Sequence, residues 1–185
     1  RGRGRVALKM MSHRFTHDLE AQRRFEREVQ ICQSLDHPNI LRIHECFNSF
    51  GTNFMVMEFC DGASLADVLR RGGALRQDQV RRVAGQLAAA LAYAHARGVC
   101  HRDLKPGNVM IDRAGCVKLT DFGLAKTAQS AELTRAGDVL GTPRYMPPEQ
   151  LAGQPVDHRA DWFAFGCIAW ELITGKPVFE GSDVV

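Results

Sequence analysis

The feature that most constrains this 185-residue chain is a polar octapeptide in its middle, followed closely by a polar tripeptide. Residues 101–108 read His-Arg-Asp-Leu-Lys-Pro-Gly-Asn, and thirteen residues after Asn108 the chain reads Asp121-Phe122-Gly123. Two short apolar runs lie between them and predict a hairpin that joins two loops. The loops supply a carboxylate, an ammonium group, a carboxamide and a second carboxylate. Phosphoryl transfer from a metal-bound nucleotide uses these groups, because an attacking hydroxyl, a moving phosphate and Mg²⁺ must all be held.

This stretch resembles the catalytic loop and the Asp-Phe-Gly segment of the eukaryotic-like protein kinases. Further matches run from Val6-Ala7-Leu8-Lys9 to residues 161–166, so the resemblance covers nearly the whole chain. Residues 141–150, Gly-Thr-Pro-Arg-Tyr-Met-Pro-Pro-Glu-Gln, are most similar to those of bacterial Ser/Thr kinases. The resemblance implies an α+β, bilobal protein-kinase-like fold, with ATP and Mg²⁺ (or Mn²⁺ in its place) bound between the lobes.

The composition is typical of a globular protein in a reducing compartment. Hydrophobic residues make up 45% of the chain, and the net charge of +3 is too small to indicate nucleic-acid binding. Six cysteines occur without a C-x-x-C pair, which favours reduced thiols over disulfides or a metal site. The most apolar stretch, residues 162–173, is too short to span a bilayer and contains Glu171. We therefore expect a cytoplasmic protein with no nucleic-acid partner and no membrane segment in this chain.

The hydrophobic pattern predicts a sheet-rich first part and a mainly helical second part. The expected strands are 6–10, 40–47, 53–58, 109–111 and 117–120, and the expected helices are 16–35, 77–97 and 161–174. The last helix is apolar nearly all round, so we expect it to be buried, and residues 124–141 have no period and indicate a loop. By resemblance, residues 1–60 form a partial N-lobe and residues 61–185 a partial C-lobe.

Lys9 and Glu28 are predicted to form an ion pair. Glu28 shares one face of its predicted helix with the apolar residues Phe25 and Cys32. A carboxylate on a buried face is costly unless it is paired, and Lys9 of the first strand is its natural partner. In the kinases that this chain resembles, such a pair aligns the α- and β-phosphates, so the resemblance assigns both residues to nucleotide binding.

The resemblance assigns the catalytic roles, and the side-chain chemistry agrees with them. Asp103 lies near two cations in the sequence and is expected to stay ionised and to orient the attacking hydroxyl. Lys105 would lie against the γ-phosphate and balance its charge. Asn108 and Asp121 offer hard oxygen ligands for Mg²⁺. His101 is expected to be structural, packed under the loop with hydrogen bonds to the backbone.

The resemblance also implies a binding place for adenine. Kinases bind this ring with backbone groups at the lobe junction, which here are the carbonyl of Glu58 and the N–H and carbonyl of Cys60. Met57 matches the gatekeeper position just before them, and Ala7 and Met110 would sandwich the purine ring. A stacked hydrophobic spine is matched by Cys32, Ile43, His101 and Phe122.

The implied acceptors are Ser and Thr hydroxyls of protein substrates. Thr142 and Lys105 match the Ser/Thr-specific members of the family and not its tyrosine kinases. Thr134 lies in the irregular loop and matches an activation-loop phosphosite, with Arg102 available to pair with its phosphate. Autophosphorylation between two copies would require self-association.

Two departures from the family pattern leave other interpretations open. No glycine-rich phosphate loop precedes Lys9, and the chain ends soon after its last predicted helix. We therefore expect a fragment of a longer kinase or a truncated gene product, which alone would be a poor kinase. One alternative is a catalytically silent pseudokinase scaffold, against which the intact Lys9, Asp103, Asn108 and Asp121 argue. The other is a small-molecule phosphotransferase, which Lys105 and the Pro-Pro-Glu segment disfavour.

Overall fold

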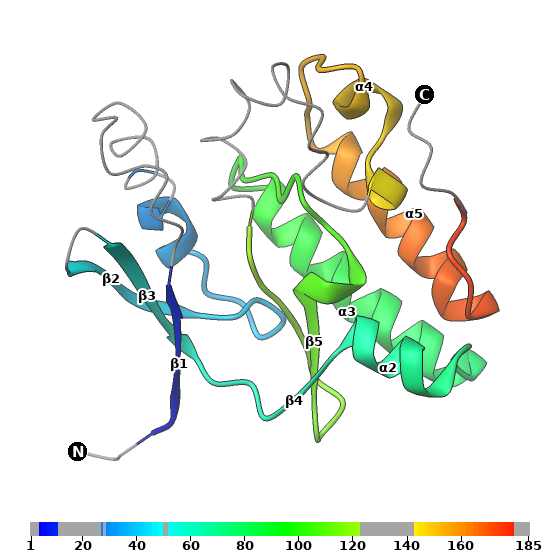
Figure 1. Cartoon of the computed structure of the whole chain (residues 1–185), viewed down its shortest axis with the longest axis horizontal. Coiled ribbons are helices and arrows are strands. Elements are labelled where there is room, and N and C mark those ends of the chain that lie inside the picture. Colours follow the sequence, from blue (N-terminus) through cyan, green and yellow to red (C-terminus); the bar gives the residue numbers. More distant parts are fainter. Residues whose placement is uncertain (1–3, 11–26, 28, 50–51, 123–142, 180–185) are drawn as a thin grey trace.

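The computed structural model describes residues 4–10, 27, 29–49, 52–122 and 143–179. Figure 1 shows two parts: a three-stranded sheet next to a short helical segment, and a larger helical part with a second sheet of its own. The chain passes from the first part to the second just after β3, near residue 60. The predicted α+β, two-lobed architecture is confirmed.

The first sheet has the strand order β1 (Val6–Met10), β3 (Thr52–Glu58) and β2 (Ile43–Ser49), and both strand pairs are antiparallel. Its register sets Val6 opposite Glu58 and Lys9 opposite Met55. Because side chains alternate along a strand, Ala7 and Lys9 share the more covered face of β1, while Leu8 is exposed. Pairing with the buried strand β3 therefore fixes the direction of Lys9.

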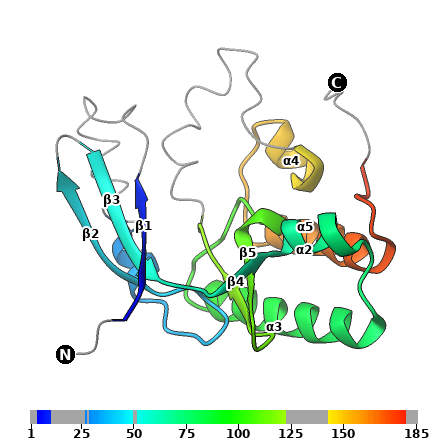
Figure 2. The ribbon, with the colours of Figure 1, turned by 60° about the horizontal axis from the view of Figure 1, so that its bottom comes forward.

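Among the residues that the structure describes, the second part is built mainly from four helices and a small antiparallel sheet. The helices are α2 (Leu65–Gly72), α3 (Gln77–His95), α4 (Pro148–Leu151) and α5 (Arg159–Thr174). The sheet order is β4 (Gly62–Ser64), β5 (Val109–Asp112), β6 (Val117–Leu119), and the 3₁₀ turns are η2 (Pro106–Asn108) and η3 (Pro143–Tyr145). Helix α3 runs beside α5 and buries Leu87, Leu91 and Ala94 at helical spacing. Figure 2 shows β4 and β5 between the first sheet and these helices.

Most of the predicted elements are confirmed with ends shifted by two residues at most, but the strand predicted over 40–47 begins only at Ile43. Residues 39–41 pair with β6 instead: the Leu41 N–H donates to the Leu119 carbonyl at 2.8 Å, and the Leu119 N–H donates to the Asn39 carbonyl at 2.8 Å. This short parallel bridge joins the two sheets. Of the helix predicted over 16–35, the structure describes residue 27 and residues 29–33 as helical.

The expectation that α5 is a buried helix holds for one face of the helix only. Its buried face carries Ala164, Ile168 and Leu172, whereas Trp170 is 52% exposed and Ile173 is 62% exposed. Apolar residues occupy almost every position of this helix, so its sequence has little periodicity. Periodicity therefore could not show which face the rest of the protein covers.

Gly62 is required by close approach of two strands, and we expect Gly62→Ala to destabilise the fold by about 3 kcal/mol. A Cβ at this position would lie 2.0 Å from the Ile111 carbonyl oxygen and 2.7 Å from the Asp112 Cα, so β4 and β5 would have to separate. Gly85→Ala is the matched control, since its Cβ meets nothing within 4 Å on helix α3. That variant should gain about 0.5–1 kcal/mol. Urea unfolding of both variants measures the difference, and equal stabilities would contradict the predicted strand contact.

Candidate active site

The loop after α3 is held by a buried carboxylate of α5. Asp161, which is 1% exposed, accepts hydrogen bonds from the backbone N–H groups of His101 at 2.7 Å and Arg102 at 2.8 Å. His95 Nε2 donates to the same carboxylate at 2.7 Å. Arg102 has a φ of 60°, an unfavourable value for a residue with a Cβ, so the loop needs such anchoring. Gln150 Nε2 contributes a further bond, to the Arg102 carbonyl at 3.1 Å.

His101 lies fully buried beneath the loop, as the sequence predicted. Its Nδ1 accepts a hydrogen bond from the Asp103 N–H at 3.2 Å, so Nε2 carries the proton and donates to the Thr120 carbonyl at 2.9 Å. Its ring packs on Phe122, with ring centroids 4.8 Å apart. Burial lowers the pKa of His101 below its usual value, which matches a neutral ring with one donor and one acceptor. His101 thus connects the loops that carry Asp103 and Asp121.

The lowered pKa of His101 predicts that the free energy of unfolding falls as the pH drops below about 6.5. In this pH range His101 binds a proton in the unfolded chain but stays neutral in the native protein. Acid therefore lowers the free energy of unfolding by up to about 1.4 kcal/mol per pH unit for this one group. Urea unfolding between pH 7.5 and pH 5 measures the slope. In His101→Asn we expect a less stable protein with a shallower slope, and an unchanged slope would exclude His101 as its source.

Asp103 forms a compact polar cluster with two other predicted catalytic residues. Its Oδ2 accepts hydrogen bonds from Lys105 Nζ at 2.9 Å and from Asn108 Nδ2 at 3.1 Å, and Asn108 Nδ2 also donates to the Asp103 carbonyl at 2.8 Å. The 3₁₀ turn η2, which begins at Pro106, folds Asn108 back over the loop. Two donors on one carboxylate favour its ionised form, which a residue that orients a hydroxyl needs.

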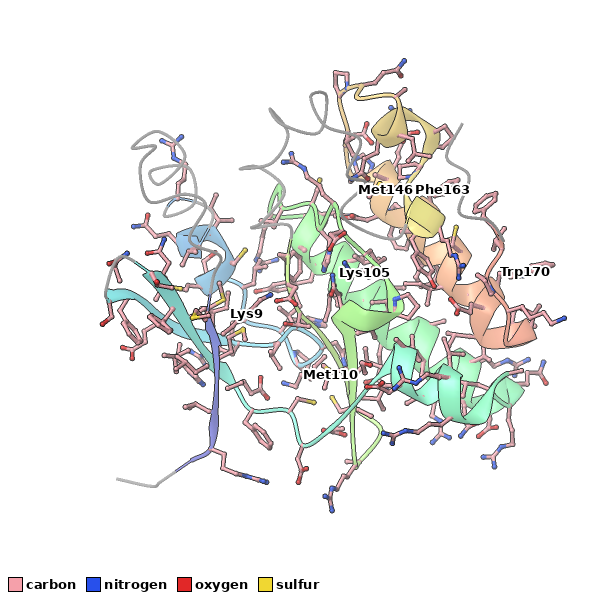
Figure 3. The ribbon with its side chains drawn as sticks, in the orientation of Figure 1. Lys9, Lys105, Met110, Met146, Phe163 and Trp170 are labelled. Atoms are coloured by element: carbon pink, nitrogen blue, oxygen red, sulfur yellow. The ribbon has the colours of Figure 1, made fainter. Side chains whose placement is uncertain are left out.

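Lys9 and Asp121 meet across the junction of the two parts. Lys9 Nζ donates to Asp121 Oδ1 at 2.5 Å, and both side chains remain partly exposed. Figure 3 shows Lys9 on β1 and Lys105 in the second part, on opposite sides of the junction. Asp121 follows β6 with a φ of 60°, a second strained non-glycine residue in the site. The predicted partner of Lys9, Glu28, lies outside the described residues.

Asn108 and Asp121 fit the requirements of a Mg²⁺ site. Asn108 is only 6% exposed, and both of its hydrogen bonds to Asp103 use the amide nitrogen Nδ2. The amide oxygen Oδ1 takes no part in them. No described residue donates a hydrogen bond to that buried Oδ1. The Thr120 N–H donates to the Asn108 carbonyl at 3.0 Å and keeps the two loops adjacent. One carboxylate and one amide oxygen match the small number of protein ligands that Mg²⁺ takes beside phosphate.

The residues predicted for adenine lie on β1 and β3 of the first sheet, just beyond β3, and on β5 of the second sheet. Ala7 of β1 is opposite Met57 of β3, and Met57 is buried. Glu58 ends β3, and the Cys60 carbonyl accepts a hydrogen bond from the Gly62 N–H at 3.0 Å. Met110 lies on β5 on the other side of the junction (Figure 3). The five residues therefore belong to both parts, as a nucleotide site between lobes requires.

A cavity of about 410 Å³ opens beside Lys105, between α2, η2 and α5. Tyr145 and Glu171 line it, and the Tyr145 hydroxyl donates to Glu171 Oε2 at 2.5 Å. Burial, followed by this carboxylate, raises the pKa of Tyr145 well above its usual range, so its hydroxyl keeps its proton. Neither residue was predicted as part of a site, because Tyr145 was considered only as part of the matching segment 141–150 and Glu171 belongs to no motif.

Thr134 and Thr142 lie outside the described residues. Within the residues that the structure does describe, no helix is long and apolar enough to cross a membrane. The structure brings Asp103, Lys105 and Asn108 together and places Lys9 against Asp121. Asp161, which the sequence did not assign to the site, anchors the backbone of the loop that carries Asp103; an acidic residue in a mainly apolar helix was the available signal.

Comparisons of the sequence and of the structure with known proteins all find protein kinases. Residues 2–184 match the family described as protein kinase domain. The chain is 37% identical over 180 residues to the serine/threonine-protein kinase PrkC of Bacillus subtilis, which covers 97% of this chain but 28% of PrkC. A crystal structure of the PknI kinase domain of M. tuberculosis matches with a TM-score of 0.79 at 32% identity, covering 100% of this chain and 68% of that chain. Rad53 1–466 in complex with AMP-PNP matches with a TM-score of 0.79 at 31% identity, covering 97% of this chain and 43% of that chain.

Proposed function

Because this chain belongs to the protein kinase domain family, we propose that it carries the catalytic site of a Ser/Thr protein kinase, which transfers the γ-phosphoryl group of ATP to hydroxyl groups of proteins. The observation that carries the proposal is the cluster in which Lys105 and Asn108 both donate to the Asp103 carboxylate. The name of PrkC, a serine/threonine-protein kinase of similar sequence, supports the same activity.

Asp103 would accept a hydrogen bond from the substrate hydroxyl and point its oxygen at the γ-phosphorus. Because the carboxylate is already held by two donors, it orients the hydroxyl and takes its proton late, as bond formation completes. Lys105 lies close enough to Asp103 for its ammonium to face the same phosphoryl group and offset the charge that develops there. The anchoring by Asp161 keeps this geometry fixed before the substrate arrives.

Lys9 and Asp121 are expected to separate when nucleotide binds. The Lys9 ammonium would move to the α- and β-phosphates, with Glu28 as its carboxylate partner, and Asp121 would join Asn108 Oδ1 in holding Mg²⁺, or Mn²⁺ in its place. The metal would supply positive charge at the phosphate oxygens. Both side chains are partly exposed, so this exchange does not require the core to rearrange.

The adenine ring would lie between Ala7 and Met110, next to the gatekeeper Met57. The backbone of Glu58 and Cys60 would provide its hydrogen bonds, as in the family. The structure of Rad53 1–466 in complex with AMP-PNP, which has a similar fold, supports the binding of a nucleotide. Free cysteines at all six positions agree with a cytoplasmic location, where ATP is available.

The acceptor would be a Ser or Thr side chain of a protein segment that lies beside Lys105, where the 410 Å³ cavity offers room. Thr142 would line the platform for this segment. Thr134 is proposed as an autophosphorylation site, modified by a second copy of the protein, with Arg102 as the partner of its phosphate.

The acceptor class tests the proposal against the small-molecule alternative. The protein as its gene encodes it is incubated with γ-labelled ATP and Mg²⁺, once with a generic basic protein and once with small alcohols. We expect label on Ser and Thr of protein, including the segment 127–142 of the kinase itself by mass spectrometry. Label on small alcohols alone would identify a small-molecule phosphotransferase, and nucleotide binding without any transfer would identify a silent scaffold.

A further inference from the structure

We propose that Lys118 is a positioning residue that ties the adenine end of the nucleotide site to the strand that carries Asp121. The proposal rests on the proposed function, because its consequence is measured as nucleotide affinity. Lys118 lies on β6, three residues before Asp121, and its Nζ is 2.8 Å from Oε1 and 3.0 Å from Oε2 of Glu58. It therefore holds both oxygens of the side chain whose backbone is proposed to bind adenine.

Glu58 has a second set of contacts, which fixes the orientation of its side chain towards Lys118. Its Oε2 also accepts the Arg42 N–H at 3.2 Å, and its own N–H donates to the Arg42 carbonyl at 2.8 Å. The Lys118 side chain is only 17% exposed, so the charge pair is partly shielded from water and from salt. A side chain fixed by an ammonium and a backbone N–H has little freedom, and its backbone shares that restraint.

The strand that carries Lys118 is itself fixed on its other side. Asn39, which is buried, donates from Nδ2 to the Val117 carbonyl at 2.9 Å and to Gln86 Oε1 at 2.8 Å, and Gln86 Oε1 also accepts the Val117 N–H at 2.9 Å. Gln86 lies on α3, so β6 is attached to the largest helix of the second part. The Lys118 side chain thus extends from a strand that Asn39 and Gln86 hold in place to Glu58 at the end of β3.

Two ion pairs therefore cross between the parts from one short segment of chain. Lys118 reaches Glu58, and Asp121 reaches Lys9, while the β1–β3 register sets Val6 opposite Glu58 and Lys9 three residues further along β1. Nucleotide and metal binding would open the Lys9–Asp121 pair, because both groups then acquire phosphate or metal partners. Neither phosphate nor metal would draw Lys118 away from Glu58. This pair therefore holds the end of β3 against β6 before and after the nucleotide binds.

Loss of the Lys118–Glu58 pair should therefore weaken nucleotide binding but leave the rate of phosphoryl transfer nearly unchanged. Without the pair, the adenine-binding backbone and Asp121 would be ordered relative to one another only when the nucleotide binds, which weakens binding through lost preorganisation. Asp103, Lys105 and Asn108 are held by hydrogen bonds to one another, whereas the Lys118 ammonium is held by Glu58, so the rate of transfer at saturating nucleotide should change little.

Lys118→Met tests the proposal, because methionine keeps most of the apolar stem and removes the ammonium. Calorimetry with Mg²⁺ and AMP-PNP should show about tenfold weaker binding, with kcat at saturating ATP within about threefold of wild type. Lys118→Arg should bind almost as wild type. Lys118→Glu combined with Glu58→Lys should recover part of the affinity that Lys118→Glu loses. Lys176→Met, at an exposed lysine, is the matched control and should bind as wild type.

The outcomes distinguish this inference from the proposed function. If wild type fails to bind Mg²⁺ and AMP-PNP, the proposed function is overturned, and this inference with it. If wild type binds and Lys118→Met binds equally well, or turns over faster, the inference alone is overturned. Should Lys118→Met unfold, as its melting curve would reveal, the Lys118→Arg and charge-reversed variants still decide the question.

Discussion

Asp103→Asn is expected to reduce the rate of phosphotransfer by about 10²–10³-fold or more while leaving the protein folded. The substitution removes the negative charge that orients the hydroxyl, and it can turn an amide N–H₂ towards the donors Lys105 and Asn108. The loop itself should persist, since its anchors are the backbone bonds to Asp161. The rate is measured with γ-labelled ATP at saturating Mg²⁺, and AMP-PNP binding is measured on the same preparation.

Asp78→Asn is the matched control for Asp103→Asn. Asp78 lies at the exposed start of α3, where it pairs with Arg76 and Arg82, and the chemical change is the same. We expect its rate and its nucleotide affinity to equal those of wild type. If Asp103→Asn keeps a rate close to that of wild type, Asp103 does not orient the acceptor and the proposed mechanism is wrong.

Asp161→Asn is expected to lower the stability of the fold by about 3 kcal/mol, as much as Gly62→Ala. The buried carboxylate accepts three hydrogen bonds, from two backbone N–H groups and His95 Nε2. An amide keeps only one acceptor oxygen, so a buried N–H of His101 or Arg102 loses its partner. Since Arg102 adopts a strained φ of 60°, the loop should also relax.

Thermal unfolding measures this loss, and about 3 kcal/mol corresponds to a melting temperature lower by roughly 6–12 °C in a domain of this size. Asp157→Asn serves as the control, because Asp157 lies just before α5 but pairs with exposed Arg159 and caps its N–H, which asparagine also does. Its melting temperature should change by no more than about 2 °C. Equal melting temperatures for the two variants would show that the buried network contributes no special stability.

The sequence predicted the local parts of this site well because their signals are local. The octapeptide 101–108 and Asp121 lie on loops at the two ends of one short hairpin, and the apolar runs that form β5 and β6 were visible as such. Once the hairpin closes, Asp103, Asn108 and Asp121 are brought near one another by chain connectivity. Membership of the protein kinase family, inferred from the same motifs, is confirmed.

The long-range parts could not be predicted in the same way. Asp161 is 58 positions from Asp103, and an aspartate in an apolar helix does not reveal which backbone groups it will bind. Glu58 was assigned to adenine binding only through its backbone, and no role was predicted for Lys118, because the pairing of their side chains depends on how β6 meets β3. The exposed side of α5 was missed for a related reason: burial depends on which surfaces meet, and a helix that is apolar all round does not contain that information.

Lys9 illustrates a further limit. The sequence predicts a pair with Glu28, because a buried carboxylate needs a cation. In the structure Lys9 contacts Asp121, and Glu28 lies outside the described residues, so the Lys9–Glu28 pair stays a prediction. Both arrangements are consistent with one cycle in which Lys9 exchanges carboxylates as nucleotide enters. Sequence patterns indicate which groups are complementary, but they do not show which carboxylate a lysine contacts.

Phosphoamino-acid analysis after labelling with γ-labelled ATP tests the central claim most directly. The protein as encoded by its gene and its Asp103→Asn variant are labelled in parallel, with Mg²⁺ or with a chelator, and a protein acceptor is present throughout. Our account predicts label on phosphoserine and phosphothreonine that requires both Mg²⁺ and Asp103. Label that persists in Asp103→Asn or without a divalent metal, or that appears on tyrosine alone, would contradict it.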